Sequence, residues 1–256
     1  MASRIVKSPA VQTTARRQYA QAAVARTERE LVKSEPLKVS TLPSGLTVAS
    51  IENHSPITTL GVAIKVSAEL TSSQSVTGSS QAGSRNESYD NTGISHALRV
   101  ASGLATKKNT AFNICKNLQQ VGGSMSCTQG REHTLYSVQV TRDQAEVGVD
   151  YLSDSVSNQV FKPWEVQRTL PRLKLELAAK SGATQAMELV HQAAFRTGLG
   201  NGLYCPDNKA GSHSTAQLSQ FTAKHFTAGR AAILGIGISH QALTKVDQQS
   251  SLSLLH

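Results

Sequence analysis

The sequence predicts an α+β domain, because short strand-like runs and longer segments with helical spacing both occur along one chain. Three strand-like runs come first, three helical segments follow one another in the second half, and two alternating runs flank Gly130-Arg131 as an antiparallel pair would. Of the 256 residues, 39% are hydrophobic and only 17% are charged. The chain can therefore bury one substantial core or two small ones, and its charge is too low for a disordered tail protein.

Strands are expected where apolar and β-branched residues run between turn signals. Pro43-Ser44-Gly45 supplies the turn between the first two runs, and the third run is almost continuously apolar, as is typical of a central strand. The predicted strands are residues 37–42, 46–51, 58–65, 124–129, 133–141 and 231–238.

Helices are expected where apolar residues recur every three or four positions. Gly122-Gly123 ends the second helix, because glycine accepts the left-handed cap. Pro163 suits the first turn of a helix, whereas Pro171 lies inside the same helix and should kink it by removing a backbone donor. The predicted helices are residues 91–104, 109–121, 143–156, 163–180, 183–195 and 214–225.

The net charge of +9 is unevenly distributed, since residues 1–19 hold four basic side chains and the first acidic residue is Glu28. The remaining bases are isolated and the chain has few aromatic rings to stack on bases, so nucleic-acid binding is not expected. The most apolar run, residues 231–238, is far shorter than the roughly 18 residues that a membrane-spanning helix needs. Any membrane contact is therefore expected to occur through partners.

The N-terminal segment has the composition of a mitochondrial transit peptide: it is rich in Ala, Ser, Thr and Arg and lacks the apolar core of a secretory signal. The membrane potential draws such a cationic segment inward. Arg17 lies two residues before Tyr19, which resembles a matrix processing site and predicts cleavage after Tyr19. The alternative is a disordered basic arm that carries no targeting signal.

Two further segments are rich in Ser, Thr or Gln and do not fit the pattern of strands and helices. The first, residues 66–81, interrupts a strand-to-helix connection, and the second is the C-terminal segment. The predicted organisation is a transit peptide with a disordered linker in 1–35, a domain in 36–246 with a disordered insertion at 66–81, and a disordered tail in 247–256.

The three cysteines, Cys115, Cys127 and Cys205, form no CxxC pair and are odd in number. That pattern argues against a disulfide framework and against a zinc ribbon, so we expect three small buried hydrophobic residues. The chain has eight histidines. Apart from His96, they show no paired spacing; they are His54, His133, His191, His213, His225, His240 and His256.

Four motifs carry a resemblance to a known family: GISHALRV at 93–100, TKK at 106–108, VGG at 121–123 and RE at 131–132. In that order and spacing the chain resembles the pitrilysin or M16 peptidases. The resemblance implies an M16 peptidase-like domain with a mostly antiparallel sheet and helices packed on one face. Active members carry an H-x-x-E-H motif, in which two histidines bind zinc and the glutamate polarises water, and a distal glutamate completes the site.

The resemblance places His96 at the first ligand position, Arg99 at that of the general base, Val100 at that of the second histidine and Glu176 at that of the distal ligand. Zinc needs about three protein ligands, and the guanidinium of Arg99 repels a cation and cannot accept a proton. We therefore expect no enzyme activity, no catalytic, metal-binding or cofactor-binding residue, and no cofactor. His96 could be a stray metal ligand, but a locally hydrogen-bonded helix histidine is preferred. Glu176 is either an exposed acid or the partner of Arg99.

Further blocks resemble the non-catalytic core proteins of the cytochrome bc1 complex, which form a branch of this family. These blocks are residues 41–46, 49–53, 93–99, 162–166, 203–207, 225–227 and 235–240. The resemblance runs over 37–246 and covers the first of two tandem domains. It implies a structural subunit of complex III on the matrix side of the mitochondrial inner membrane, with the other subunits, especially core protein 1, as partners. The alternative is a subunit of the mitochondrial processing peptidase, a zinc metalloendopeptidase.

Overall fold

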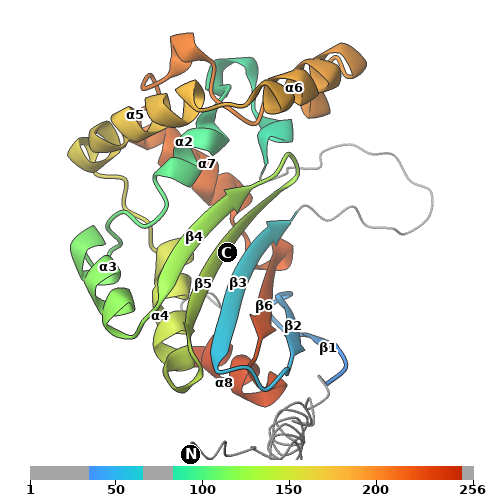
Figure 1. Cartoon of the computed structure of the whole chain (residues 1–256), viewed down its shortest axis with the longest axis vertical. Coiled ribbons are helices and arrows are strands. Elements are labelled where there is room, and N and C mark those ends of the chain that lie inside the picture. The colour runs from blue at the N-terminus through green and yellow to red at the C-terminus, as the bar shows by residue number, and fades with distance from the viewer. Residues whose placement is uncertain (1–34, 66–82, 250–256) are drawn as a thin grey trace, which may run out of the picture. The chain divides into compact units, whose positions relative to one another are not determined.

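A six-stranded mixed sheet organises the part of the chain that the computed structural model describes, residues 35–65 and 83–249 (Figure 1). The strand order is β1-β2-β6-β3-β5-β4, and every neighbouring pair is antiparallel except β2 and β6, which are parallel. The predicted mostly antiparallel sheet is therefore confirmed. The strands are β1 Lys38–Thr41, β2 Thr47–Ile51, β3 Ile57–Lys65, β4 Ser124–Gln129, β5 His133–Thr141 and β6 Ala231–Ile236.

One face of the sheet is buried and the other is open. Along β3 the side chains of Leu60, Val62 and Ile64 are completely buried, because alternate residues of a strand point to the same face. On the opposite face, Leu234 and Ile236 of β6 are partly exposed. Helices α4 and α8 pack against the sheet, as Figure 1 shows for this part of the domain, so the prediction of helices on one face is confirmed.

All six predicted helices are present, and one helix appears that the sequence analysis did not expect. The described helices are α2 Ile94–Val100, α3 Ala111–Gln120, α4 Ala145–Ser157, α5 Pro163–Ala178, α6 Gly182–Ala194, α7 Thr215–His225 and α8 His240–Gln249. Helix α5 passes through Pro171 as a single helix. No described helix is both long enough and apolar enough to cross a membrane.

Helix α8 occupies a polar segment that carries a weak start signal. The hydroxyl of Ser239 accepts a hydrogen bond from the backbone N–H of Ala242, as an N-cap residue does, and Leu243 is completely buried. The helix runs to Gln249, into the segment expected to be a disordered tail. The leader (1–34), the insertion (66–82) and residues 250–256 lie outside the described residues, so the expectations for them stay predictions.

Helix α2 is fixed at its N-terminus by a glycine and by a buried carboxylate. Gly93 has φ +87°, and a Cβ atom there would lie 2.6 Å from Cys205. The carboxylate of Glu87 accepts hydrogen bonds from the backbone N–H groups of Gly93 (2.7 Å) and Ser95 (3.0 Å). A negative group at this end of a helix is favourable, because the first N–H groups have no partner within the helix. These contacts set the position of every side chain on α2.

We expect Gly93→Ala to lower the free energy of unfolding by more than about 2 kcal/mol, because it combines an unfavourable φ with a collision against Cys205. The matched control is Gly182→Ala in α6, where a Cβ atom meets nothing within 4 Å. The control should be neutral or stabilising by up to about 1 kcal/mol. Urea titrations of both variants measure the difference, and equal stabilities would contradict the packing described for Gly93.

Candidate functional site

The residues that the sequence analysis singled out come together between α2 and α5. His96 and Arg99 lie on α2, and Glu176 lies on α5. His96 is completely buried, whereas the side chains of Arg99 and Glu176 are 23% and 24% exposed. The site is therefore closed toward the core and open beside Arg99.

The carboxylate of Glu176 joins the two helices. Its Oε2 accepts a hydrogen bond from His96 Nε2 at 3.0 Å and also pairs with the guanidinium of Arg99. Its Oε1 lies 3.4 Å from Nε of Arg172. Burial alone would raise the pKa of Glu176, but the hydrogen bond from His96 and the charge of Arg99 outweigh it and lower the pKa. Glu176 is thus an ionised partner of Arg99, as one of the two predicted alternatives stated.

The hydrogen bonds of His96 fix which ring nitrogen carries the proton. Nδ1 accepts from the backbone N–H of Cys205 at 3.2 Å, so Nε2 bears the hydrogen that it donates to Glu176. Burial lowers the pKa of His96, and the ring of Tyr204 packs edge-on at 5.2 Å between centroids. His96 is therefore a neutral helix histidine with both nitrogens engaged, but its partners, Glu176 and Cys205, are distant in the sequence and not local as expected.

These side chains do not fit a zinc ion. His96 has no free lone pair to offer, and the guanidinium of Arg99 contacts the same carboxylate oxygen that a metal would need. Val100 packs in a small buried cluster with Leu173 and Cys205. Among the residues that the structure describes, no group of three or more His, Cys, Asp or Glu side chains is arranged to hold a metal.

The two thiols near this cluster, those of Cys127 and Cys205, have raised pKa values and are poor nucleophiles. Burial raises the pKa of Cys127 to about 12 and that of Cys205 to about 11, so both remain protonated at neutral pH. Cys205 is completely buried, as expected, and Cys127 is half-buried. The expectation was wrong for Cys115, which is exposed on α3, because the buried stripe of that helix consists of Ile114 and Leu118.

Sequence reasoning missed the residues that complete the surroundings of His96. His213 Nε2 lies 3.8 Å from the sulfur of Cys205, and burial lowers the pKa of His213. Glu87 was not singled out either, although it holds the start of α2. The residues in these contacts are only six to eight positions apart, but they lie in irregular segments whose folding no periodic pattern in the sequence predicts.

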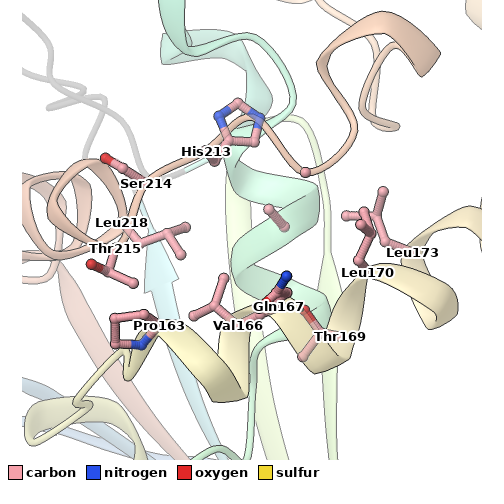
Figure 2. A pocket seen from close by; sticks show the side chains of 12 residues that line it. Pro163, Val166, Gln167, Thr169, Leu170, Leu173, His213, Ser214, Thr215 and Leu218 are labelled. Atoms are coloured by element: carbon pink, nitrogen blue, oxygen red, sulfur yellow. Dashed lines mark hydrogen bonds between the residues drawn. The ribbon is translucent and has the colours of Figure 1, made fainter.

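Two hollows flank α2. The smaller, about 220 Å³, lies beside Arg99 and is walled by Cys127, Gln129 and Tyr204, among others. The larger, about 430 Å³, lies between α5 and the start of α7 and is mostly apolar. Figure 2 shows Val166 and Leu170 of α5 on one side of this hollow, with Leu218 and His213 across from them. Among the described residues that line these two hollows, none carries a carboxylate that could act as a general base.

Comparison with known proteins gives consistent matches. The profile of the family described as Insulinase (Peptidase family M16) matches residues 48–207. Human cytochrome b-c1 complex subunit 2, mitochondrial, is 36% identical over 217 residues, which cover 84% of this chain and 44% of that protein. Arabidopsis thaliana probable mitochondrial-processing peptidase subunit alpha-1 is 28% identical over 217 residues, which cover 84% of this chain and 40% of that protein. The mitochondrial-processing peptidase subunit beta of Blastocladiella emersonii is 28% identical over 249 residues, which cover 93% of this chain and 50% of that protein. The chain spans about half the length of the relatives it matches.

A double-mutant cycle between Arg99→Met and Glu176→Gln should give a coupling energy of about 1–2 kcal/mol, because both groups are largely shielded from water. The pKa of Glu176 is lowered in the folded state, so this stabilisation should be complete above pH 4.5 and be lost as the pH falls through the lowered value.

The control cycle uses Arg85 and Glu132, whose paired side chains are 39% and 52% exposed. That pair should couple by less than about 0.5 kcal/mol. Equal coupling in the two cycles, measured by urea unfolding, would show that the Glu176 pair has no special role.

Proposed function

Because the chain belongs to the M16 (insulinase) peptidase family, we propose that it is a non-catalytic structural subunit of the mitochondrial cytochrome bc1 complex. Its role there is to support assembly and stability of the complex that transfers electrons from ubiquinol to cytochrome c. The similarity to human subunit 2, over 84% of this chain, supports this assignment.

The observation that carries the proposal is the ion pair of Arg99 with Glu176. An M16 peptidase needs a general base that takes a proton from water, and arginine, which stands at that position here, cannot do so. Glu176 already accepts hydrogen bonds from His96 and Arg99 and has a lowered pKa, so it is a poor base. The three side chains form a structural link between α2 and α5 in place of a hydrolytic centre.

A second candidate is a subunit of the mitochondrial processing peptidase. The specific support is the Blastocladiella emersonii beta subunit, whose match covers 93% of this chain. A chain in that role would contribute to presequence handling beside a catalytic partner. The two candidates differ in the complex with which the chain co-purifies.

We further propose that the chain resides in mitochondria on the matrix side of the inner membrane, with core protein 1 and the other subunits as its partners. The relatives named above from human and Arabidopsis are mitochondrial by name, and the N-terminal segment has the composition of a transit peptide. Membrane contact is then made through the partners.

The purified chain should contain no stoichiometric zinc, because His96 and Glu176 supply two ligands at most and Arg99 repels the ion. Metal analysis by mass spectrometry checks this. In the double variant Arg99→Glu with Val100→His, metal binding should return before hydrolysis does, since the groups that orient the ligands are not restored. About one zinc per wild-type chain, lost in His96→Ala, would overturn the proposal.

An epitope-tagged chain imported into isolated mitochondria should migrate with the cytochrome bc1 complex on native gels. It should resist protease until the inner membrane is opened, and N-terminal sequencing should place its first residue at or near Ala20. Co-purification with the processing peptidase instead would favour the second candidate. A chain that joins neither complex would contradict both.

A further inference from the structure

Helix α6 presents its apolar side to solvent. No residue of this helix is buried, and Met187, Leu189 and Val190 are 58%, 64% and 60% exposed. Large apolar side chains exposed together along one helix are unusual on a surface that contacts only water. The segment is therefore not explained by the packing of this domain.

The polar side of α6 faces the domain instead. The partly buried positions are Thr184, Glu188 and His191, which recur at helical spacing, and Oε1 of Glu188 accepts a hydrogen bond from the backbone N–H of Leu203 at 2.8 Å. Most of the exposed positions are apolar, namely Ala183, Ala186, Met187, Leu189, Val190, Ala193 and Ala194, with Gln185 and Gln192 as the exposed polar side chains. This is the reverse of the arrangement that a solvated surface helix adopts.

Helix α5 also exposes large apolar side chains to solvent. Trp164 and Leu175 are 59% and 69% exposed, and the exposed bases Arg168 and Lys174 lie between them in the sequence of the helix. Figure 1 shows α5 and α6 at the same end of the domain, away from α8. We call the exposed side chains of Leu175, Met187, Leu189 and Val190, with those of Arg168 and Lys174, the α5–α6 surface.

The α5–α6 surface is positively charged, because the carboxylates of both helices form hydrogen bonds within the domain. Glu165 accepts a hydrogen bond from the backbone N–H of Ala105, Glu176 holds His96 and Arg99, and Glu188 holds Leu203. In contrast, Arg168 and Lys174 are exposed and form no ion pair with any residue of the described ranges. The surface thus combines apolar area with uncompensated positive charge.

We propose that the α5–α6 surface binds an acidic amphipathic segment of another protein subunit. Apolar residues of that segment would cover Met187, Leu189 and Val190, and its carboxylates would pair with Arg168 and Lys174. The alanines of α6 allow a facing helix to approach closely.

The same features disfavour other occupants. A second copy of this chain, related by two-fold symmetry, would bring identical bases face to face. A cationic targeting peptide meets the same repulsion.

The test uses the full chain and a labelled synthetic helix made of leucine on one side and glutamate on the other. Fluorescence anisotropy should show binding that weakens with salt, and the same peptide with lysine in place of glutamate should not bind. Met187→Gln with Val190→Gln should weaken binding by about tenfold, as should Arg168→Gln with Lys174→Gln. The control, Phe112→Gln on α3, removes an equally exposed apolar side chain elsewhere and should change nothing.

All substituted side chains are exposed, so circular dichroism should show that every variant remains folded. Equal binding of the two peptides, or binding that the surface variants leave unchanged, would overturn the proposal. So would binding to phosphatidylglycerol vesicles, or self-association in analytical ultracentrifugation, that disappears in the Met187→Gln, Val190→Gln variant. The test needs no bc1 complex, so its result is independent of the proposed function.

Discussion

The arrangement around α2 depends on one carboxylate, that of Glu176, which is shared by His96 and Arg99. The His96 ring is buried and neutral, so its Nε2–H needs an acceptor, and the guanidinium of Arg99 needs a counter-charge at a half-buried position. A single oxygen of Glu176 meets both needs. This sharing ties α2 to α5 and places a permanent protein cation, the guanidinium of Arg99, against the carboxylate of Glu176.

The same cluster connects to α6 through a short loop. Cys205 donates its backbone N–H to His96, and two residues earlier Leu203 donates its N–H to Glu188 of α6. Gly93 lets the loop approach α2, because any side chain there would collide with Cys205. The cluster of His96, Arg99 and Glu176 is thus linked to α6 by hydrogen bonds through this loop.

Much of this structure could be predicted from the sequence, and the misses have physical causes. Local signals were sufficient for the strands and for the end of α3 at Gly122-Gly123. The family resemblance left two alternatives for Glu176, an exposed acid or the partner of Arg99, and the structure shows the ion pair. Helix α8 was missed because its burial rests on Leu243 within a polar segment. The contact of His213 with Cys205 depends on how the short segment between them folds, and no sequence motif predicts that fold. The periodicity of α6 predicted a helix correctly but gave no sign that its apolar side faces outward.

The central claim is that Glu176 holds His96 as a neutral imidazole protonated at Nε2 and thereby excludes a metal. Two-dimensional ¹⁵N–¹H NMR of the histidine side chains tests this directly, since the two ring tautomers have different nitrogen shifts. The account predicts that His96 is the Nε2–H tautomer, that it stays neutral as the pH is lowered through 6.5, and that added zinc leaves its signals unchanged. A proton on Nδ1, or a zinc-dependent shift at Nε2, would contradict it.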